Sequence, residues 1–267
     1  MDIIPFTANR VFVYEHLNRA KRFHCSVTGT FEYDVTELVA AIDEARAQGR
    51  SIGLVALLVK ATGMLMNQHP RMNRHVFHRM WKKLEVDFQK ISCTLIVLRE
   101  GPAGEDILFP VLLEEPHSRS VEDIHAEIKH YKTAELSTLP QIQAFERIKK
   151  MPHWQMRWFS YKARSDPKFY LRYFGTYGLS SMLTRDWGGI GGSALANTGS
   201  GFQPGVLRDE PKVIDGAIVV RKMLRLNVVA DHFLLDGMDV LRAMQDLRPL
   251  LETNQLIPPL NSAMPED

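Results

Sequence analysis

Hydrophobic and polar residues alternate near the start of the chain in a pattern typical of a β-strand. Over residues 24–34, Cys25, Val27 and Phe31 belong to the apolar series, and Ser, Thr and Glu residues fill the other series. A period of two predicts a strand with one buried face, and it places the Cys25 thiol in the core as a small apolar group. A segment with a helical pattern and a basic end, 11–22, precedes this strand.

The rest of the chain alternates between helical and strand-like patterns. Ser51 and Ser120 are suited to begin helices as N-caps, whereas Pro152 and Pro249 interrupt or end them. A stretch rich in Gly, Ser and Asn, 188–205, predicts an irregular loop. The pattern therefore predicts an α/β protein in which helices pack on a mixed sheet. The predicted helices are 36–48, 54–68, 121–131, 140–164 and one after Gly237, and the predicted strands are 85–89, 92–98, 107–113 and 217–230.

Length and charge narrow the class of protein. The 267 residues suit a single domain, 1–267, with terminal extensions at 1–9 and 253–267. They carry 33 Lys and Arg against 31 Asp and Glu, a balance that argues against nucleic-acid binding. The longest apolar run, 52–66, is interrupted by Lys60 and too short to span a membrane, and no signal peptide is visible. We therefore expect a cytoplasmic protein without a membrane span, and its two cysteines predict no disulfide framework.

Candidate chemistry lies where a long apolar strand ends. His232, Asp236 and Gly237 form the pattern His-x-x-x-Asp-Gly just before the last helix. A histidine at a strand end is held firmly and can still face a cleft, and an acid four residues later can brace the loop. The glycine can supply a positive φ or a close backbone approach. Taken alone, the pattern fits equally well a structural histidine that is paired with Asp236.

The same segment resembles a family signature. Residues 228–238 are similar to Asp-His-Arg-x-x-Asp-Gly of dihydrolipoamide acyltransferase catalytic domains and to His-His-x-x-x-Asp-Gly of chloramphenicol acetyltransferase. Further resemblances together extend from Arg10 to Glu252. The resemblance implies a chloramphenicol acetyltransferase-like two-layer sandwich with a mixed sheet. It also implies a homotrimer, or an assembly of trimers, whose active sites lie between subunits. The other similar stretches are 27–39, 66–70, 107–112, 120–124 and 211–223.

The resemblance also assigns roles to residues. Residues 174–182 are similar to the family's Gly-Thr-Phe-Thr-Ile-Ser-Asn-Leu, which places Ser180 on the hydroxyl that stabilises the oxyanion, with Ser181 as the alternative. Ser180 lies 52 residues before His232. Asp236 is then the acid that braces the site through an ion pair, and Arg10 matches its usual N-terminal partner.

The implied reaction is direct acyl transfer. His232 would act as general base on a thiol, hydroxyl or amine acceptor, and the donor would be acyl-coenzyme A or an acyl-lipoyl or carrier-bound thioester. No tightly bound cofactor and no metal are implied. Phe233 stands where the dihydrolipoamide enzymes have Arg, and no lipoyl domain, subunit-binding domain or Ala/Pro linker is seen. A lipoyl or carrier substrate would therefore come from another chain, or the acceptor is small.

Aromatic residues in 140–164 have two interpretations. Trp154, Trp158, Phe159 and Tyr161 either reshape the acceptor side or, as we expect, fill a core or a trimer seam.

The sequence gives less support to three other functions. A serine hydrolase needs Gly-x-Ser-x-Gly, and the segment 178–182 lacks the second glycine. A metal hydrolase is disfavoured because His117, His125 and His130 do not form a close metal-binding frame. A non-catalytic trimeric scaffold or interaction protein of the same fold remains the alternative.

Overall fold

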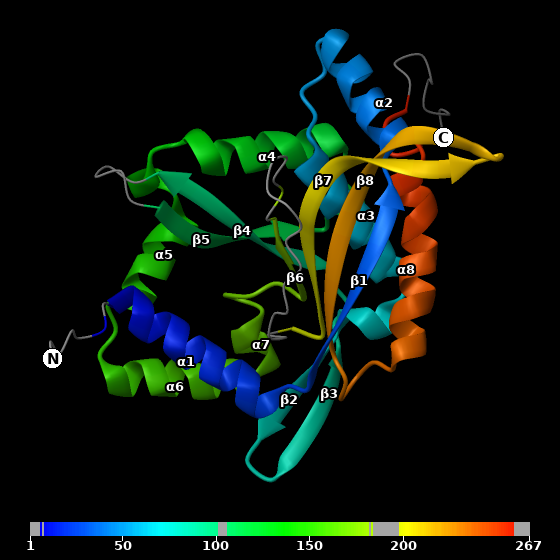
Figure 1. The fold of residues 1–267 in the computed structure, drawn as a ribbon. Coiled ribbons are helices and arrows are strands. Elements are labelled where there is room, and N and C mark those ends of the chain that lie inside the picture. Colours follow the sequence, from blue (N-terminus) through cyan, green and yellow to red (C-terminus); the bar gives the residue numbers. More distant parts are fainter. Residues whose placement is uncertain (1–5, 7, 101–105, 182, 184–197, 259–267) are drawn as a thin grey trace, which may run out of the picture.

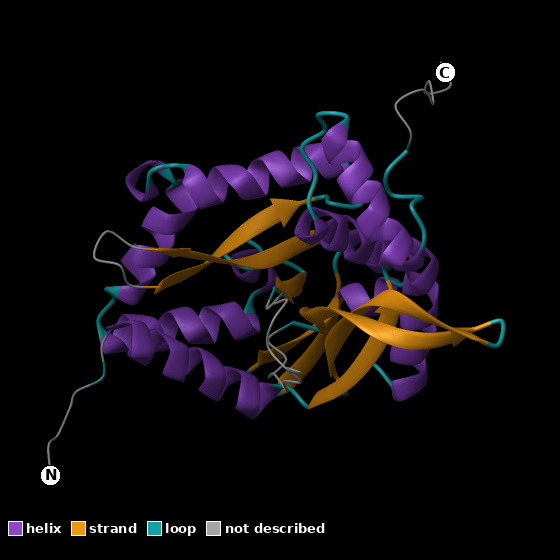
Figure 2. Cartoon of the chain, turned by 45° about the horizontal axis from the view of Figure 1, so that its top comes forward, coloured by secondary structure: helices purple, strands orange, loops and turns teal. Residues whose placement is uncertain are grey.

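The computed structural model describes residues 6, 8–100, 106–181, 183 and 198–258. A six-stranded sheet forms its centre, and a separate two-stranded hairpin projects below the sheet (Figure 1). Helices surround the strands, as Figure 2 shows, which confirms the predicted α/β class. The strands are β1 (Ser26–Asp34), β2 (Arg74–Arg79), β3 (Lys82–Asp87), β4 (Ser92–Glu100), β5 (Asp106–Glu114), β6 (Tyr177–Ser180), β7 (Ser200–Ile214) and β8 (Ala217–Asp231).

The central sheet is mixed. Its strand order is β1-β8-β7-β6-β4-β5, and β6 runs parallel to both of its neighbours while the other pairs are antiparallel. β7 and β8 form a long hairpin whose turn contains Asp215 and Gly216 with positive φ angles of 50° and 80°. Asp-Gly is a favoured pair for such a tight turn because both positions require the left-handed region. The hairpin brings the end of β8, where the signature lies, back beside the start of β1.

The helices of the described residues fall into two groups. They are α1 (Ala8–Phe23), α2 (Thr36–Ala47), α3 (Leu54–Gln68), α4 (Val121–Thr133), α5 (Pro140–Lys149), α6 (His153–Ser165), α7 (Pro167–Tyr170) and α8 (Gly237–Glu252). α3 is buried along most of its length and packs against β4, α4 and α8, so it forms the centre of the main core. α1, α5 and α6 gather at the lower left of Figure 1, beside β5 and β2. None of the helices described is long and apolar enough to cross a bilayer.

Several boundaries differ from the sequence prediction. Gly53, not Ser51, precedes the first residue of α3, whereas Ser120 caps α4 as predicted by accepting a hydrogen bond from the Asp123 amide at 3.1 Å. The predicted loop 188–205 is wrong at its end, because 200–205 belong to β7; residues 188–197 lie outside the described part. The first residues of the extension predicted after 252 belong to the core, because the Leu256 and Ile257 side chains are buried.

The two cysteines lie in different environments. Cys25 is exposed, which corrects the prediction of a buried thiol: β1 begins one residue later, so the strand alternation does not extend to Cys25. Cys93 is fully buried in β4, and burial raises the pKa of its thiol to about 12.

The Cys93 thiol is therefore expected to be unreactive in the folded protein. In a Cys25→Ser variant, a thiol reagent at pH 8 should label less than about a tenth of the protein over an hour, because only the thiolate reacts. Unfolding in urea should make the same thiol fully reactive. Rapid labelling of the folded variant would contradict the described packing of β4.

Candidate active site

The turn that follows β8 holds His232 in a defined orientation. Its backbone N–H donates to the Cys25 carbonyl at 2.7 Å, which fastens the turn to the residue before β1. Its ring Nδ1 lies 2.8 Å from the Leu235 carbonyl oxygen. A carbonyl only accepts hydrogen bonds, so Nδ1 carries a hydrogen, and in the neutral ring the lone pair is on Nε2. The side chain is 47% exposed, so Nε2 is available to a molecule approaching from outside the chain.

Asp236 begins the last helix. Its carboxylate oxygen lies 3.8 Å from His232 Nδ1, too far for a hydrogen bond, and the side chain points to solvent. Its backbone N–H donates to Asp239 Oδ2 at 3.1 Å. Adding a Cβ to Gly237 would meet nothing within 4 Å and its φ is not positive, so neither predicted reason for a glycine applies within the chain.

Arg71 braces the signature loop within the chain. Its guanidinium lies 2.9 Å from Asp239 Oδ2 and donates to the Leu234 carbonyl at 3.1 Å. The predicted partner of Asp236, Arg10, lies in the first turns of α1, about 20 Å along the helix from the end that approaches β1. Pairing of Arg10 with Asp236 therefore stays a prediction, and it would need a contact between subunits.

A buried histidine–carboxylate pair lies directly beneath the turn. The Asp231 carboxylate accepts a hydrogen bond from His24 Nδ1 at 2.7 Å, and both side chains are almost fully buried. It also accepts the backbone N–H groups of Cys25 and Phe233 at 3.0 and 3.1 Å. Burial raises the pKa of the Asp231 carboxyl, but the hydrogen bonds from His24 and the two amides outweigh burial, and the pKa lies below the ordinary aspartate value. The pair thus fixes the backbone on both sides of His232.

Sequence reasoning missed this pair. Asp231 belongs to the quoted signature, and a carboxylate at the end of an apolar strand was the available signal; His24, at a chain separation of 207 residues, carried none. Behind His24 lies His75, with ring centroids 5.1 Å apart, and His75 in turn stacks on Tyr170 at 4.7 Å. Burial, with nearby cationic groups, holds the pKa of His75 well below its ordinary range. The ring is therefore neutral and packs behind the His24–Asp231 pair.

Ser180 is the last residue of β6. It pairs with Ile96 of β4, and it lies on the sheet face opposite the buried side chain of Leu179. Leu179 is in register with Phe202, which pairs with Val228 of β8. His232 therefore lies about five residues along the strand direction and two strands across the sheet from Ser180. These two displacements correspond to about 19 Å between the two backbones.

A single chain thus does not bring Ser180 and His232 together. Ser181 directly follows Ser180 in the chain, and the alternative assignment meets the same separation. The site shared between subunits stays a prediction, and it is the arrangement in which these groups can meet.

The residues before Ser180 hold β6 against β4. The Thr176 amide donates to the Ser92 carbonyl at 2.8 Å, and its buried hydroxyl accepts the Ser92 amide at 3.1 Å. A Cβ on Gly175 would lie 2.6 Å from the Ser92 carbonyl oxygen and 2.7 Å from the Thr94 amide nitrogen. Only glycine fits this close approach, so the Gly-Thr of the family pattern positions the strand that carries Ser180.

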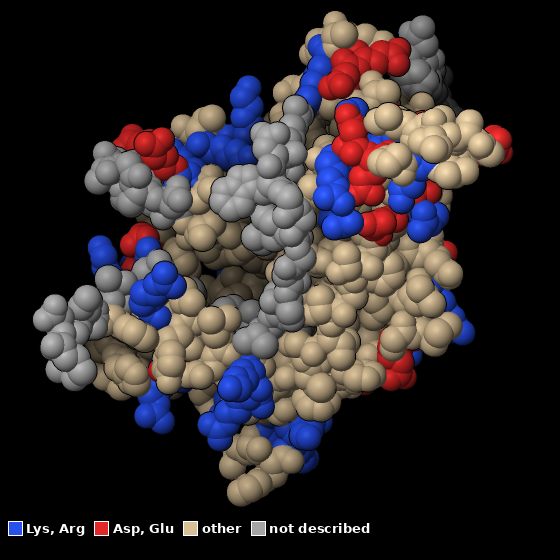
Figure 3. Space-filling model, viewed as in Figure 1, with Lys and Arg blue, Asp and Glu red and all other residues tan. Residues whose placement is uncertain are grey.

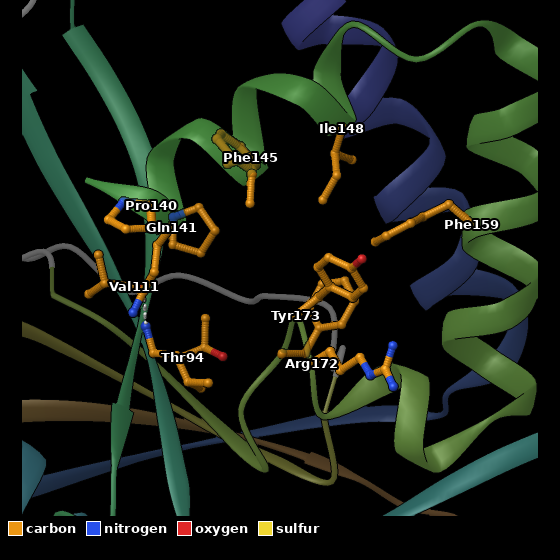
Figure 4. Close-up of a pocket in the computed structure, with 13 residues that line it drawn as sticks. Thr94, Val111, Pro140, Gln141, Phe145, Ile148, Phe159, Arg172 and Tyr173 are labelled. Carbon is orange, nitrogen blue, oxygen red and sulfur yellow. Dashed lines mark hydrogen bonds between the residues drawn. The ribbon is translucent and has the colours of Figure 1, made fainter. Parts of the chain in front are cut away.

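An apolar pocket of about 290 Å³ opens on the same sheet face. Figure 3 shows a hollow in this region, and Figure 4 shows Phe145, Ile148 and Phe159 pointing into a common space above Tyr173. Thr94 forms part of the wall and is paired with Gly178, two residues before Ser180. The pocket therefore begins about 7 Å along the strand from the predicted oxyanion residue.

Two polar side chains of the pocket wall, those of Gln141 and Thr94, are already hydrogen-bonded, and Arg172 and Tyr173 also line the wall. Gln141 accepts the Leu112 amide at 2.9 Å, drawn as a dashed line in Figure 4, and donates to the Tyr131 hydroxyl at 2.8 Å. The Thr94 hydroxyl accepts the Gly175 amide at 2.7 Å. A ligand group in this space would consequently meet mostly carbon.

Solved structures share this architecture. The chain resembles a probable dihydrolipoamide acetyltransferase from Listeria monocytogenes with a TM-score of 0.69 and 20% identity, over 98% of both chains. It resembles the dihydrolipoamide acetyltransferase of Azotobacter vinelandii with a TM-score of 0.67 and 21% identity, over 96% of this chain and 93% of the other. A chloramphenicol acetyltransferase matches with a TM-score of 0.51 and 13% identity, over 94% and 98% of the two chains. The fold is therefore the chloramphenicol acetyltransferase-like fold that the sequence predicted.

Sequence matches narrow the class further. Residues 202–257, which contain the signature, match the family described as 2-oxoacid dehydrogenases acyltransferase (catalytic domain). The lipoamide acyltransferase component of the branched-chain alpha-keto acid dehydrogenase complex of Pseudomonas putida is 46% identical over 67 residues. That match covers 24% of this chain and only 16% of the relative's length. Fold and sequence together indicate an acyltransferase related to these catalytic domains.

One relative offers a spacing for comparison. The Azotobacter enzyme was studied for the role of a serine, a histidine and an asparagine in its catalytic mechanism; the serine precedes the histidine by 52 positions and the asparagine follows it by four. Ser180, His232 and Asp236 have the same separations.

Proposed function

We propose that this protein transfers an acyl group directly from a thioester to a thiol, hydroxyl or amine acceptor, with His232 as the general base. One observation carries the proposal: the Leu235 carbonyl holds the Nδ1 hydrogen, so the exposed Nε2 is the basic nitrogen. The spacing shared with the serine and histidine of the Azotobacter enzyme supports Ser180 and His232 as partners. That enzyme has an asparagine where this chain has Asp236, so the position need not move a proton.

The proposed chemistry needs no covalent enzyme intermediate. His232 Nε2 takes the acceptor proton while the acceptor atom attacks the thioester carbonyl carbon. The resulting oxyanion receives a hydrogen bond from the Ser180 hydroxyl, a contribution of about 3 kcal/mol in comparable sites. The intermediate then collapses, the carbon–sulfur bond breaks, and the leaving thiolate recovers the proton from the imidazolium.

The two groups would come from neighbouring subunits of a trimer. Within one chain they lie about 19 Å apart, so a second chain must supply the hydroxyl. Exposed apolar side chains at the far end of the β7–β8 hairpin offer surface for such a neighbour, namely Val213, Ile218 and Val220. One solved structure of similar fold is the cubic core of the pyruvate dehydrogenase multienzyme complex, with a TM-score of 0.64 and 19% identity. That likeness supports assembly as a proposal for this chain.

The volume of the pocket indicates which acyl groups would fit. A cavity of about 150 Å³ lined by apolar side chains holds benzene, so a pocket of about 290 Å³ has room for an acyl chain well beyond acetyl. We propose that the apolar part of the acyl group lies there, with its carbonyl toward Ser180. The donor is acyl-coenzyme A or a lipoyl- or carrier-bound thioester.

Narrowing the pocket is expected to change the preferred acyl length. Ala144 lines the pocket, and Ala144→Phe should lower kcat/KM for octanoyl-coenzyme A by about ten-fold or more, because its ring occupies the space of the chain. The value for acetyl-coenzyme A should change by less than about two-fold. Release of free thiol with a panel of acceptors measures both.

Ala144→Ser is the matched control, because it keeps the pocket volume. An equal loss with both donors would mean that the pocket does not hold the acyl chain. Failure of every donor and acceptor to release thiol above the rate of a His232→Ala variant would favour the non-catalytic scaffold.

A further inference from the structure

The outer face of α6 carries large aromatic side chains that the chain does not cover. Trp154, Trp158 and Tyr161 recur at intervals of four and three residues, so they form one stripe along the helix. Their side chains are 70%, 54% and 38% exposed. The opposite side of α6 is buried as expected, with Phe159 in the small core that borders the pocket. Within the chain only Phe159 fills a core, and for the other three the predicted place in a trimer seam stays a prediction.

Positive charge is concentrated in the sequence that contains this helix, and three of its basic residues, Arg157, Lys162 and Arg164, lie on α6 itself. Between 147 and 173 the sequence has eight Lys and Arg and one acid, Asp166. The remainder of the chain has 25 Lys and Arg against 30 Asp and Glu, so this segment is basic within an otherwise acidic protein. The eight basic residues are Arg147, Lys149, Lys150, Arg157, Lys162, Arg164, Lys168 and Arg172.

The single acid is engaged in local structure. Asp166 accepts the amides of Lys168 and Phe169 at 3.0 and 3.1 Å and thereby begins α7. These hydrogen bonds, led by that from Phe169, hold the pKa of its carboxyl below the ordinary value. Its other carboxylate oxygen lies 3.8 Å from Lys162 Nζ, so Asp166 offsets one of the eight positive charges. Basic side chains lie over the aromatic stripe, with Arg164 centred 4.8 Å from the Tyr161 ring and Lys162 Nζ 6.0 Å from the Trp158 ring.

We propose that this aromatic–basic face of α6 binds the surface of an anionic lipid bilayer. Trp and Tyr favour the boundary between headgroups and acyl chains, and Lys and Arg are attracted to anionic headgroups. A helix with aromatic residues on one stripe and cations beside them is the composition of an interfacial membrane helix. If vesicle binding fails, nucleic acid or a second copy of this chain is the expected occupant of the stripe.

The position of the pocket fits this surface. Phe159 lines the pocket from the inner side of α6, whereas Trp158 lies on the outer side of the same helix. The two residues are neighbours on the helix, about 100° apart around its axis, and the ring centroids of Trp158 and Phe159 lie 5.8 and 5.3 Å from that of Phe169. If the proposed function holds, the bilayer would bring apolar acyl groups close to the pocket; the membrane-binding proposal itself does not need turnover.

Co-sedimentation of the full-length protein with vesicles tests the proposal. The probes are vesicles of 30% phosphatidylserine in phosphatidylcholine and vesicles of phosphatidylcholine alone. We expect binding to the anionic vesicles to be at least about ten-fold tighter and to weaken in 0.5 M salt, since each basic residue near such a surface contributes a factor of about five. A Trp154→Ser/Trp158→Ser variant should bind at least about ten-fold more weakly.

Trp81→Ser is the matched control. Trp81 is 95% exposed at the turn between β2 and β3, outside the aromatic stripe of α6, and its loss should leave vesicle binding unchanged. Circular dichroism and light scattering show whether each variant keeps its fold and its assembly. Equal binding to both vesicle types, or equal binding by the double variant, would overturn the proposal. Loss of self-association in the double variant without a change in vesicle binding would instead assign the face to a second copy.

Discussion

Replacement of His232 by alanine is expected to lower the rate of acyl transfer by about 100-fold or more while the protein stays folded. The ring is half-exposed, and its polar contacts among the described residues are with Leu235 and Asp236 in its own turn. Removing it therefore costs little packing but removes the only nitrogen proposed to take the acceptor proton. Thiol release under saturating donor and acceptor measures the rate, and urea unfolding measures the stability.

A second histidine serves as the control. His69 lies on the surface and contacts Asp246 at 2.9 Å, so His69→Ala should leave the rate within about two-fold of the unmodified protein. A His232→Ala protein that keeps a third or more of the activity would remove His232 from the proton transfer.

Replacement of Asp231 by alanine is expected to have the largest effect on stability, about 3–5 kcal/mol. The change leaves the buried His24 without its carboxylate and removes the acceptor of the Cys25 and Phe233 amides. Because those amides flank His232, activity should fall as well, even at temperatures where the variant is folded. Urea unfolding at neutral pH gives the free-energy difference.

The loss of stability in the Asp231→Ala variant should depend on pH. The pKa of Asp231 is depressed in the folded protein, so its stabilising contribution is fully present above the unfolded value of about 4 and is lost as the pH falls through the lower folded value. The stability difference between the unmodified protein and Asp231→Ala should therefore shrink in acid. Asp246→Ala, at an exposed carboxylate, should cost less than about 1 kcal/mol. A cost for Asp231→Ala as small as that control would contradict the role of the buried pair.

Much of the fold could be predicted from local patterns. The alternation over 24–34 became β1, and the helix predicted at 54–68 matches α3 at both ends, because a mostly apolar helix bounded by Gly and His-Pro has few other solutions. Pro152 separates α5 from α6, as predicted from the missing amide of proline. The signature itself lies at the predicted strand–helix junction.

What could not be predicted depends on contacts between distant segments. Nothing near His24 in the sequence indicates that its ring will meet Asp231, because that contact follows from the pairing of β1 with β8. The exposure of Trp158 beside the burial of Phe159 likewise depends on which side of α6 faces the core, and both are aromatic. The separation of Ser180 from His232 is a property of strand register, which the spacing of 52 residues does not contain.

Mixed trimers test the central claim that the base and the oxyanion donor come from different subunits. Ser180→Ala and His232→Ala chains, co-expressed with different tags and purified through both tags, form trimers that contain both kinds of chain. In such a closed ring one of the three interfaces combines an intact Ser180 with an intact His232, so we predict about one third of the activity of the unmodified trimer. Activity no higher than that of the two parent variants would contradict the shared site.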